Sequence, residues 1–168
     1  IQSSLYRKKN ISKKEFSRTP FSKTGSETTL IGGKLKDKTI LRHIEPEAFL
    51  IWQRLYESYD LWIKAGFDYV PIEPIQSFRL NKRGLVDVFS GVLDLSLNNW
   101  EEISAEFVPE LHDDKRKILQ VLNENKISHG HTHNNNLCLR FFRHENGEVD
   151  FTKKPRLYLI DFDQAFLL

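Results

Sequence analysis

The sequence predicts an α+β protein in which a small antiparallel sheet with one helix precedes a mainly helical part. Three observations lead to this fold class. Short β-branched and apolar runs, separated by turn residues, occur within residues 24–44 and again within residues 75–93. Residues 47–64 carry apolar side chains at three- and four-residue spacing, which is typical of an amphipathic helix. A length of 168 residues suffices for one packed domain or for two small lobes around a cleft.

The first part begins with a basic, polar lead-in at residues 1–23. We expect this lead-in to be solvated or frayed, with a phosphate- or RNA-contacting arm as the alternative. Residues 28–35 and 39–44 are rich in β-branched and apolar side chains and are separated by a charged turn, so they predict an antiparallel meander. The helix over residues 47–64 follows a proline and is expected to end at Gly66.

The second part follows an extended connector in which two prolines disfavour helix. The elements expected from there on are the connector (70–74), a hairpin of two strands (75–80 and 85–93), a short helix (98–107), a longer helix (113–125) and two strands (137–143 and 156–160).

Composition narrows the class of protein. The apolar share of 39%, the aromatic share of 12% and the charged share of 29% are ordinary for a globular protein. A net charge of +2 is too small to indicate nucleic-acid binding by itself. Cys138 is the single cysteine, which excludes an internal disulfide framework, and no apolar run approaches the ~20 residues that a membrane helix needs. We therefore expect a cytoplasmic protein without membrane or nucleic-acid partners.

Two segments carry the candidate chemistry. The first contains His129-Gly130-His131, and Asn136 follows five residues after His131, just before an apolar strand. The second is an apolar strand that ends in Asp161-Phe162-Asp163. Asparagine amide and aspartate carboxylate oxygens are hard ligands suited to Mg²⁺. Neighbouring strand ends would bring Asn136 and Asp161 together, so these two residues are the candidate magnesium ligands, with Asp163 as a further candidate.

Together, the two segments resemble the paired signatures of aminoglycoside phosphotransferases, choline kinases and related kinase-like enzymes. In that family a helix leads into His-Gly-Asp-x-x-x-x-Asn, and a later apolar strand ends in Ile-Asp-Phe or Ile-Asp-Trp. The resemblance implies a two-lobed, protein-kinase-like fold. A nucleotide-binding lobe would cover residues 24–93, and a helical lobe with the catalytic loop and the metal-binding hairpin would cover residues 94–168. Because the chain stops soon after Asp161 and contains no methionine, we expect this second lobe to be incomplete.

The same resemblance implies ATP and Mg²⁺ as cofactors and a small-molecule or protein hydroxyl as the phosphoryl acceptor. It places the phosphate-pairing basic residue on the strand at 39–44, an acidic partner on the helix at 47–64, and the adenine beside residues 89–93. The residues implied to contact the nucleotide are Arg42, Glu47, Phe89 and Gly91, with Lys36 or Lys38 as alternatives to Arg42, and Glu57 as an alternative to Glu47. An arginine instead of the family's lysine is a departure, because the two cations bind phosphate differently.

His131 is the larger departure, since it stands where the family has its catalytic aspartate. A neutral imidazole can act as a general base near pH 7, so His131 is compatible with catalysis. A nucleotide-binding or interaction module with impaired catalysis, a pseudokinase, is the alternative. In the family's usual arrangement His129 braces the loop by hydrogen bonding and takes no part in the chemistry.

The segment Gly130-His131-Thr132-His133 also resembles an element of calcineurin-like metallophosphatases. Alternating histidines suit a metal ion, so a metal-dependent phosphoesterase is a second alternative. The further Asp-x-His, Gly-Asp and Gly-Asn-His motifs that complete the two metal sites of that family are absent from this sequence.

Overall fold

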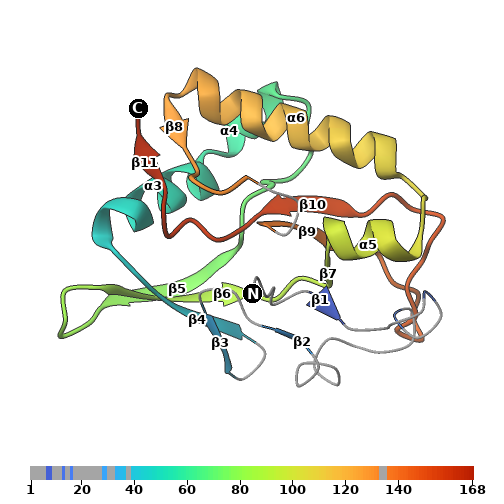
Figure 1. Ribbon diagram of the computed structural model, residues 1–168, viewed down its shortest axis with the longest axis horizontal. Helices are drawn as coiled ribbons and strands as arrows, with labels where there is room; N and C mark the ends of the chain where they lie inside the picture. The colour runs from blue at the N-terminus through green and yellow to red at the C-terminus, as the bar shows by residue number, and fades with distance from the viewer. Residues whose placement is uncertain are drawn as a thin grey trace.

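The protein has the α+β class that the sequence predicts, as the computed structural model shows (Figure 1). The structure describes residues 7–8, 13, 16, 28–29, 33–36, 39–132 and 136–168. The elements in these ranges are β1 (Arg7–Lys8), β2 (Thr28–Thr29), β3 (Gly33–Lys36), β4 (Thr39–Ile44), α3 (Pro46–Glu57), α4 (Tyr59–Lys64), β5 (Ile75–Leu80), β6 (Val86–Gly91), β7 (Leu95–Ser96), α5 (Leu97–Ile103), α6 (Val108–Glu124), β8 (Ile127–Ser128), β9 (Leu137–Arg140), β10 (Arg156–Leu159) and β11 (Phe166–Leu167).

The first part of the chain forms a four-stranded antiparallel sheet in the order β3-β4-β6-β5. The predicted meander appears as β3 and β4, and the predicted hairpin appears as β5 and β6. Asn81 fixes the hairpin turn, because its Oδ1 accepts hydrogen bonds from the backbone N–H groups of Arg83 and Leu85. Gly84 completes this turn with a positive φ of 82°, which glycine adopts readily.

The single helix expected at residues 47–64 is two helices, α3 and α4, separated by Ser58. The backbone of Ser58 is not helical, with φ −89° and ψ 60°, and its Oγ donates a hydrogen bond to the carbonyl of Arg54 at 2.5 Å. Such back-bonding by serine competes with the helical hydrogen-bond ladder. The indole N–H of Trp62 donates to the carbonyl of Leu55 at 2.8 Å, so α4 satisfies an end carbonyl of α3 while both helices bury tryptophans in the core.

In the second part α6 begins at Val108, five residues before the expected start at residue 113. Phe107 adopts the left-handed conformation, with φ 61°, and turns the chain into the helix. Pro109 is compatible with the first helical turn, where a missing N–H loses no hydrogen bond. The charged run that begins at Asp113 therefore lies inside α6 and does not mark its start.

The β9–β10 hairpin lies between the four-stranded sheet and α6 (Figure 1). It forms a three-stranded antiparallel sheet in the order β10-β9-β7, and β11 pairs with β8. The apolar core runs across both parts of the chain: Trp52 of α3 stacks on Phe162, with ring centroids 6.1 Å apart. None of the helices in the described ranges combines the length and apolar character needed to cross a bilayer.

Two residues of the basic lead-in are packed on the second part of the chain. Phe16 is fully buried, with its ring centroid 5.1 Å from that of Phe141 and 6.3 Å from that of Trp100. The Nζ of Lys13 lies 4.6 Å from the ring centroid of Phe151. The expectation of a solvated lead-in therefore does not hold at these two positions. Apart from Arg7 and Lys8, the rest of the lead-in lies outside the described residues.

Candidate functional site

The β9–β10 hairpin brings Asn136 and Asp161 together as the sequence predicts. Asn136 immediately precedes β9, and Asp161 follows β10 by two residues. The antiparallel register pairs Leu137 with Leu159, and the backbone N–H of Ile160 donates to the carbonyl of Asn136 at 2.9 Å. Both candidate ligands are buried, with exposed fractions of 1% for Asn136 and 6% for Asp161.

One oxygen of each side chain lacks a hydrogen bond. Asn136 Oδ1 and Asp161 Oδ1 are buried and have no hydrogen-bond partner in the described part of the chain. The amide of Asn136 is held by its Nδ2, which donates to the carbonyl of His131 at 2.8 Å. Buried acceptors without donors are rare and destabilising. Two of them at adjoining strand ends match the oxygen ligands of Mg²⁺, which typically binds protein through one or two side chains and keeps several waters or phosphate oxygens.

Asp161 is also unusual in its backbone and its ionisation. Its φ of 64° lies in the left-handed region, which is unfavourable for a non-glycine residue and is found disproportionately at functional sites. Burial, aided by the neighbouring Asp163 and Glu73 and opposed by Arg42, raises the pKa of Asp161 to about 7. Asp163 is exposed, and its place as a metal ligand stays a prediction.

Arg42 and Glu73 form a buried ion pair beside Asp161. The Nε of Arg42 donates to Glu73 Oε2 at 2.9 Å, and Arg42 Nη1 lies 3.7 Å from Asp161 Oδ1. Glu73 is fully buried and accepts two more hydrogen bonds, from Ser90 Oγ at 2.7 Å and from the backbone N–H of Asp161 at 3.0 Å. One carboxylate therefore joins the basic residue of β4, a side chain of β6 and the backbone of the candidate metal ligand.

The sequence did not identify Glu73. The acidic partner of Arg42 was expected on the helix, at Glu47 or Glu57, but it comes from the connector between α4 and β5. A charged residue inside the otherwise apolar and proline-rich run of residues 70–75 was the available signal, because a buried carboxylate must be paired.

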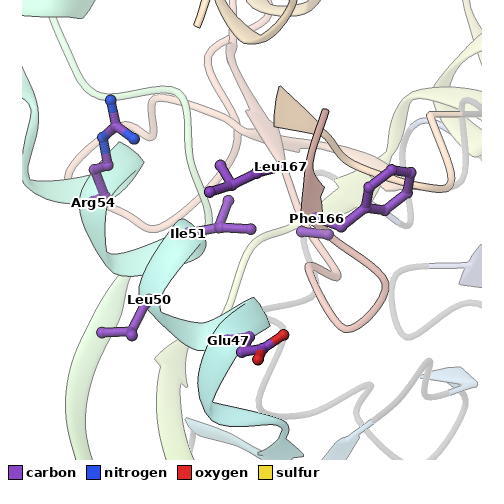
Figure 2. A pocket seen from close by; sticks show the side chains of 7 residues that line it. Glu47, Leu50, Ile51, Arg54, Phe166 and Leu167 are labelled. Atoms are coloured by element: carbon purple, nitrogen blue, oxygen red, sulfur yellow. The ribbon is translucent and has the colours of Figure 1, made fainter. Parts of the chain in front are cut away.

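Glu47 lies on the exposed side of α3, in a cavity of about 450 Å³ between α3 and β11. Figure 2 shows the side chain of Leu167 pointing toward Ile51, with Glu47 and Arg54 at opposite ends of the cavity. Glu47 therefore lies apart from the Arg42–Glu73 pair, and its role in cofactor binding stays a prediction.

Phe89 and Gly91 lie on β6, next to the strand that carries Arg42. Side chains alternate between the two faces of a strand, so Phe89 faces away from Ser90, which contacts Glu73. Gly91 packs closely on the connector: a Cβ at this position would lie 3.3 Å from Cβ of Pro74. The side chain of β6 that contacts the ion pair is thus Ser90. No role for this residue was predicted from the sequence.

His129 makes the bracing contacts expected of it. Its Nε2 lies 2.7 Å from the carbonyl of Ile160, and its Nδ1 accepts a hydrogen bond from the backbone N–H of His131 at 3.2 Å. These partners require a neutral ring with the proton on Nε2. Burial lowers the pKa of His129, which agrees with the neutral form. The ring also packs edge-on against Phe162, with centroids 4.8 Å apart.

The loop between His129 and Asn136 is only partly described. Gly130 has a φ of 94°, and a Cβ there would lie 2.8 Å from Cβ of Gln164, so this position requires glycine. His131 is exposed at the surface of the loop. His133, the second histidine of the phosphoesterase alternative, lies outside the described residues. Within those residues no group of three His, Cys, Asp or Glu side chains is arranged to hold a metal ion.

Comparison with known proteins assigns no family. No family model matches the chain, and no curated protein matches it. Among solved structures it is similar to a chain in the crystal structure of the yeast RNA Pol II CTD kinase CTDK-1 complex, with a TM-score of 0.42 and 18% sequence identity. The match covers 100% of this chain and 48% of that chain, so this chain spans about half the length of the chain it matches. A likeness this distant carries no argument for function, which must come from the site itself.

Proposed function

We propose that this chain binds a nucleoside triphosphate with Mg²⁺ and that it acts as a kinase-like phosphotransferase on a hydroxyl of a small molecule or a protein. The observation that carries the proposal is the pair of buried oxygens without hydrogen bonds, Asn136 Oδ1 and Asp161 Oδ1, at adjoining strand ends. A guanidinium, that of Arg42, stands 3.7 Å from the second of these oxygens.

The chemistry of phosphoryl transfer fits this arrangement, because it depends on positioning and charge neutralisation more than on covalent chemistry by the protein. Bound Mg²⁺ would neutralise charge on the phosphate oxygens. Arg42 is fixed by Glu73 and would pair with those oxygens, while Glu73 holds the backbone of Asp161 in its left-handed conformation. His131 would accept the proton of the acceptor hydroxyl as the hydroxyl oxygen bonds to phosphorus and the bond to the departing nucleoside diphosphate breaks.

A second candidate, a nucleotide-binding or interaction module without catalysis, is favoured by one feature. The resemblance to kinase-like enzymes implies that the base lies beside residues 89–93, close to the layer between β4 and the β9–β10 hairpin. Here five side chains that meet in that layer are at most 6% exposed: Ile40, Leu93, Cys138, Tyr158 and Ile160. A base entering between them would have to separate a packed apolar cluster, which opposes nucleotide binding.

The proposal is tested by magnesium-dependent nucleotide binding. We expect ATP with Mg²⁺, but not ATP with EDTA, to raise the melting temperature of the chain, because a ligand of the folded state stabilises it. Asp161→Ala should abolish this shift, and Asp60→Ala, which removes an exposed carboxylate on α4, should leave it unchanged. An equal shift in wild type and Asp161→Ala would contradict the metal assignment.

Phosphotransfer is tested separately from binding. With ATP and Mg²⁺ bound, His131→Ala should lower turnover of a hydroxyl acceptor while leaving the melting shift intact. If wild type and His131→Ala both bind ATP but neither phosphorylates any acceptor, the result would support the second candidate, a module without catalysis.

A further inference from the structure

A second pocket, of about 220 Å³, lies on the side of the β9–β10 hairpin that faces α6. It is formed by the chain after α4, by α6 and by the segment that enters β10. Its lining residues are Gly66, Phe67, Asp68, Tyr69, Asp114, Lys117, Phe142, Lys154, Pro155 and Arg156. Aromatic and basic side chains therefore share one small space, which the proposed phosphotransfer does not use.

Aromatic rings hold the guanidinium of Arg156 in place. Its Cζ lies 4.9 Å from the ring centroid of Tyr69 and 5.5 Å from that of Phe142. The hydroxyl of Tyr69 is fixed in turn, because it donates to the carbonyl of Leu157 at 3.0 Å and accepts from the N–H of the same residue at 2.8 Å. In the described part of the chain the guanidinium of Arg156 contacts these two rings and the hydroxyl of Tyr158. It forms no ion pair with a carboxylate there.

Positive charge accumulates around this guanidinium. Arg140 is the direct cross-strand partner of Arg156 in the antiparallel register, and like charges directly opposite each other destabilise a strand pair. The Nζ of Lys117 lies 3.7 Å from the position that a Cβ on Gly66 would occupy, at the edge of the pocket. Lys153 lies against the other aromatic wall, 5.7 Å from the ring centroid of Phe142.

Carboxylates balance only part of this charge. Asp114 is buried and pairs with Lys154, at 2.6 Å between Nζ and Oδ2, and this pair closes one side of the pocket. Asp68 is the other acidic residue in the lining. The pocket lining thus has three basic side chains, Lys117, Lys154 and Arg156, against two carboxylates, and Arg140 adds a further cation on the neighbouring strand. Binding of an anion would offset the repulsion between them.

We infer that this pocket binds a phosphate group, either inorganic phosphate or the phosphate of a monoester. A guanidinium held in one plane offers two parallel N–H donors that match two phosphate oxygens, and lysine ammonium groups supply point charges. The pocket is too small for a whole nucleotide, but an aromatic wall formed by Phe142 can accommodate the first atoms of an ester. Arg156 begins β10 whereas Asp161 follows the opposite end of that strand, so this site is distinct from the proposed metal site.

The test is a titration with inorganic phosphate at constant ionic strength, followed by calorimetry and by ³¹P line broadening. We expect saturable binding to wild type, and at least a tenfold loss of affinity in both Lys117→Ala and Arg156→Gln. Lys82→Ala, which removes an exposed lysine in the β5–β6 turn, is the matched control and should bind as wild type does. Circular dichroism of each variant verifies the fold, and Lys117→Ala carries the test if Arg156→Gln does not fold.

Two further arms identify the site and the source of the phosphate. Asp161→Ala should retain phosphate binding, because the metal site lies elsewhere; loss of binding in that variant would move the phosphate to the nucleotide site and overturn the inference. Phenyl phosphate that binds tighter than inorganic phosphate would indicate a monoester ligand, and equal or weaker binding would indicate free phosphate. Absence of saturable binding, or equal binding in Lys117→Ala, Arg156→Gln and wild type, would also overturn it.

Discussion

Replacing Glu73 by glutamine should destabilise the protein strongly, because this carboxylate is fully buried and accepts three hydrogen bonds. Glutamine keeps one acceptor oxygen but puts an NH₂ group where the second oxygen stood. At least one donor, the Nε of Arg42 or the N–H of Asp161, then faces another donor. Removing one partner of a buried ion pair costs about 3–5 kcal/mol, since the remaining charge is left uncompensated. For a chain of this length that corresponds to roughly 6–20 °C in melting temperature.

The assay is thermal and urea unfolding of Glu73→Gln, followed by far-UV circular dichroism, with Glu57→Gln as the control. Glu57 is exposed at the end of α3, and its replacement should change the free energy of unfolding by no more than about 0.5 kcal/mol. In the double variant Arg42→Met, Glu73→Gln the loss of stability should be smaller than the sum of the two single losses, because the guanidinium that Glu73→Gln leaves uncompensated is then absent. A Glu73→Gln variant within about 1 kcal/mol of wild type would refute the assignment of Glu73 as the central acceptor.

Three further outcomes follow from burial and ionisation. Phe16→Ala should lower the free energy of unfolding by about 3–5 kcal/mol, whereas Phe166→Ala, whose side chain is 52% exposed, should change it by less than about 1 kcal/mol; similar values for both would contradict the docking of the lead-in. Because burial lowers the pKa of His129, the unfolded chain binds its proton first as the pH falls below about 6.5. The contribution of His129 to stability is therefore complete above that pH and declines below it, and the urea midpoint should fall less with pH in His129→Gln. Asp161→Asn should melt at a higher temperature than wild type in metal-free buffer at about pH 8, because it removes a buried carboxylate whose pKa is raised to about 7. A lower melting temperature than wild type would argue against that cause.

Local patterns in the sequence predicted the parts of the fold that depend on neighbouring residues. The apolar strands around Asn136 and Asp161 could be read directly, and their antiparallel pairing brings the two side chains together as expected. The break between α3 and α4 within residues 47–64 could not be predicted in this way. Periodicity carries on through Ser58, whereas the break depends on a side-chain hydrogen bond to Arg54 that competes with the helix.

The parts that the sequence did not reveal depend on partners far apart in the chain. Glu73 bonds to Arg42 across 31 residues and to the backbone of Asp161 across 88. No periodic pattern in the sequence links positions so far apart. The acidic partner of Arg42 was therefore expected on the helix that follows it directly in the chain. Phe16 is a similar case, since only the folded chain shows that Trp100 and Phe141 form the apolar surface on which it packs.

The origin of Glu73 has a consequence for how the candidate site is held. The connector that carries it runs beside β10: the N–H of Glu73 donates to the carbonyl of Leu159, and the N–H of Leu159 donates to the carbonyl of Pro71, both at 2.9 Å. The backbone of Glu73 is therefore tied to the strand that leads to Asp161, and its carbonyl also accepts a hydrogen bond from the indole N–H of Trp52 on α3 at 2.8 Å. A shift of β10 would move Glu73 and Asp161 together, and Trp52 couples the same stretch of backbone to α3. The basic residue, its acidic partner and the candidate metal ligand are thus joined by hydrogen bonds and ion pairs within the core.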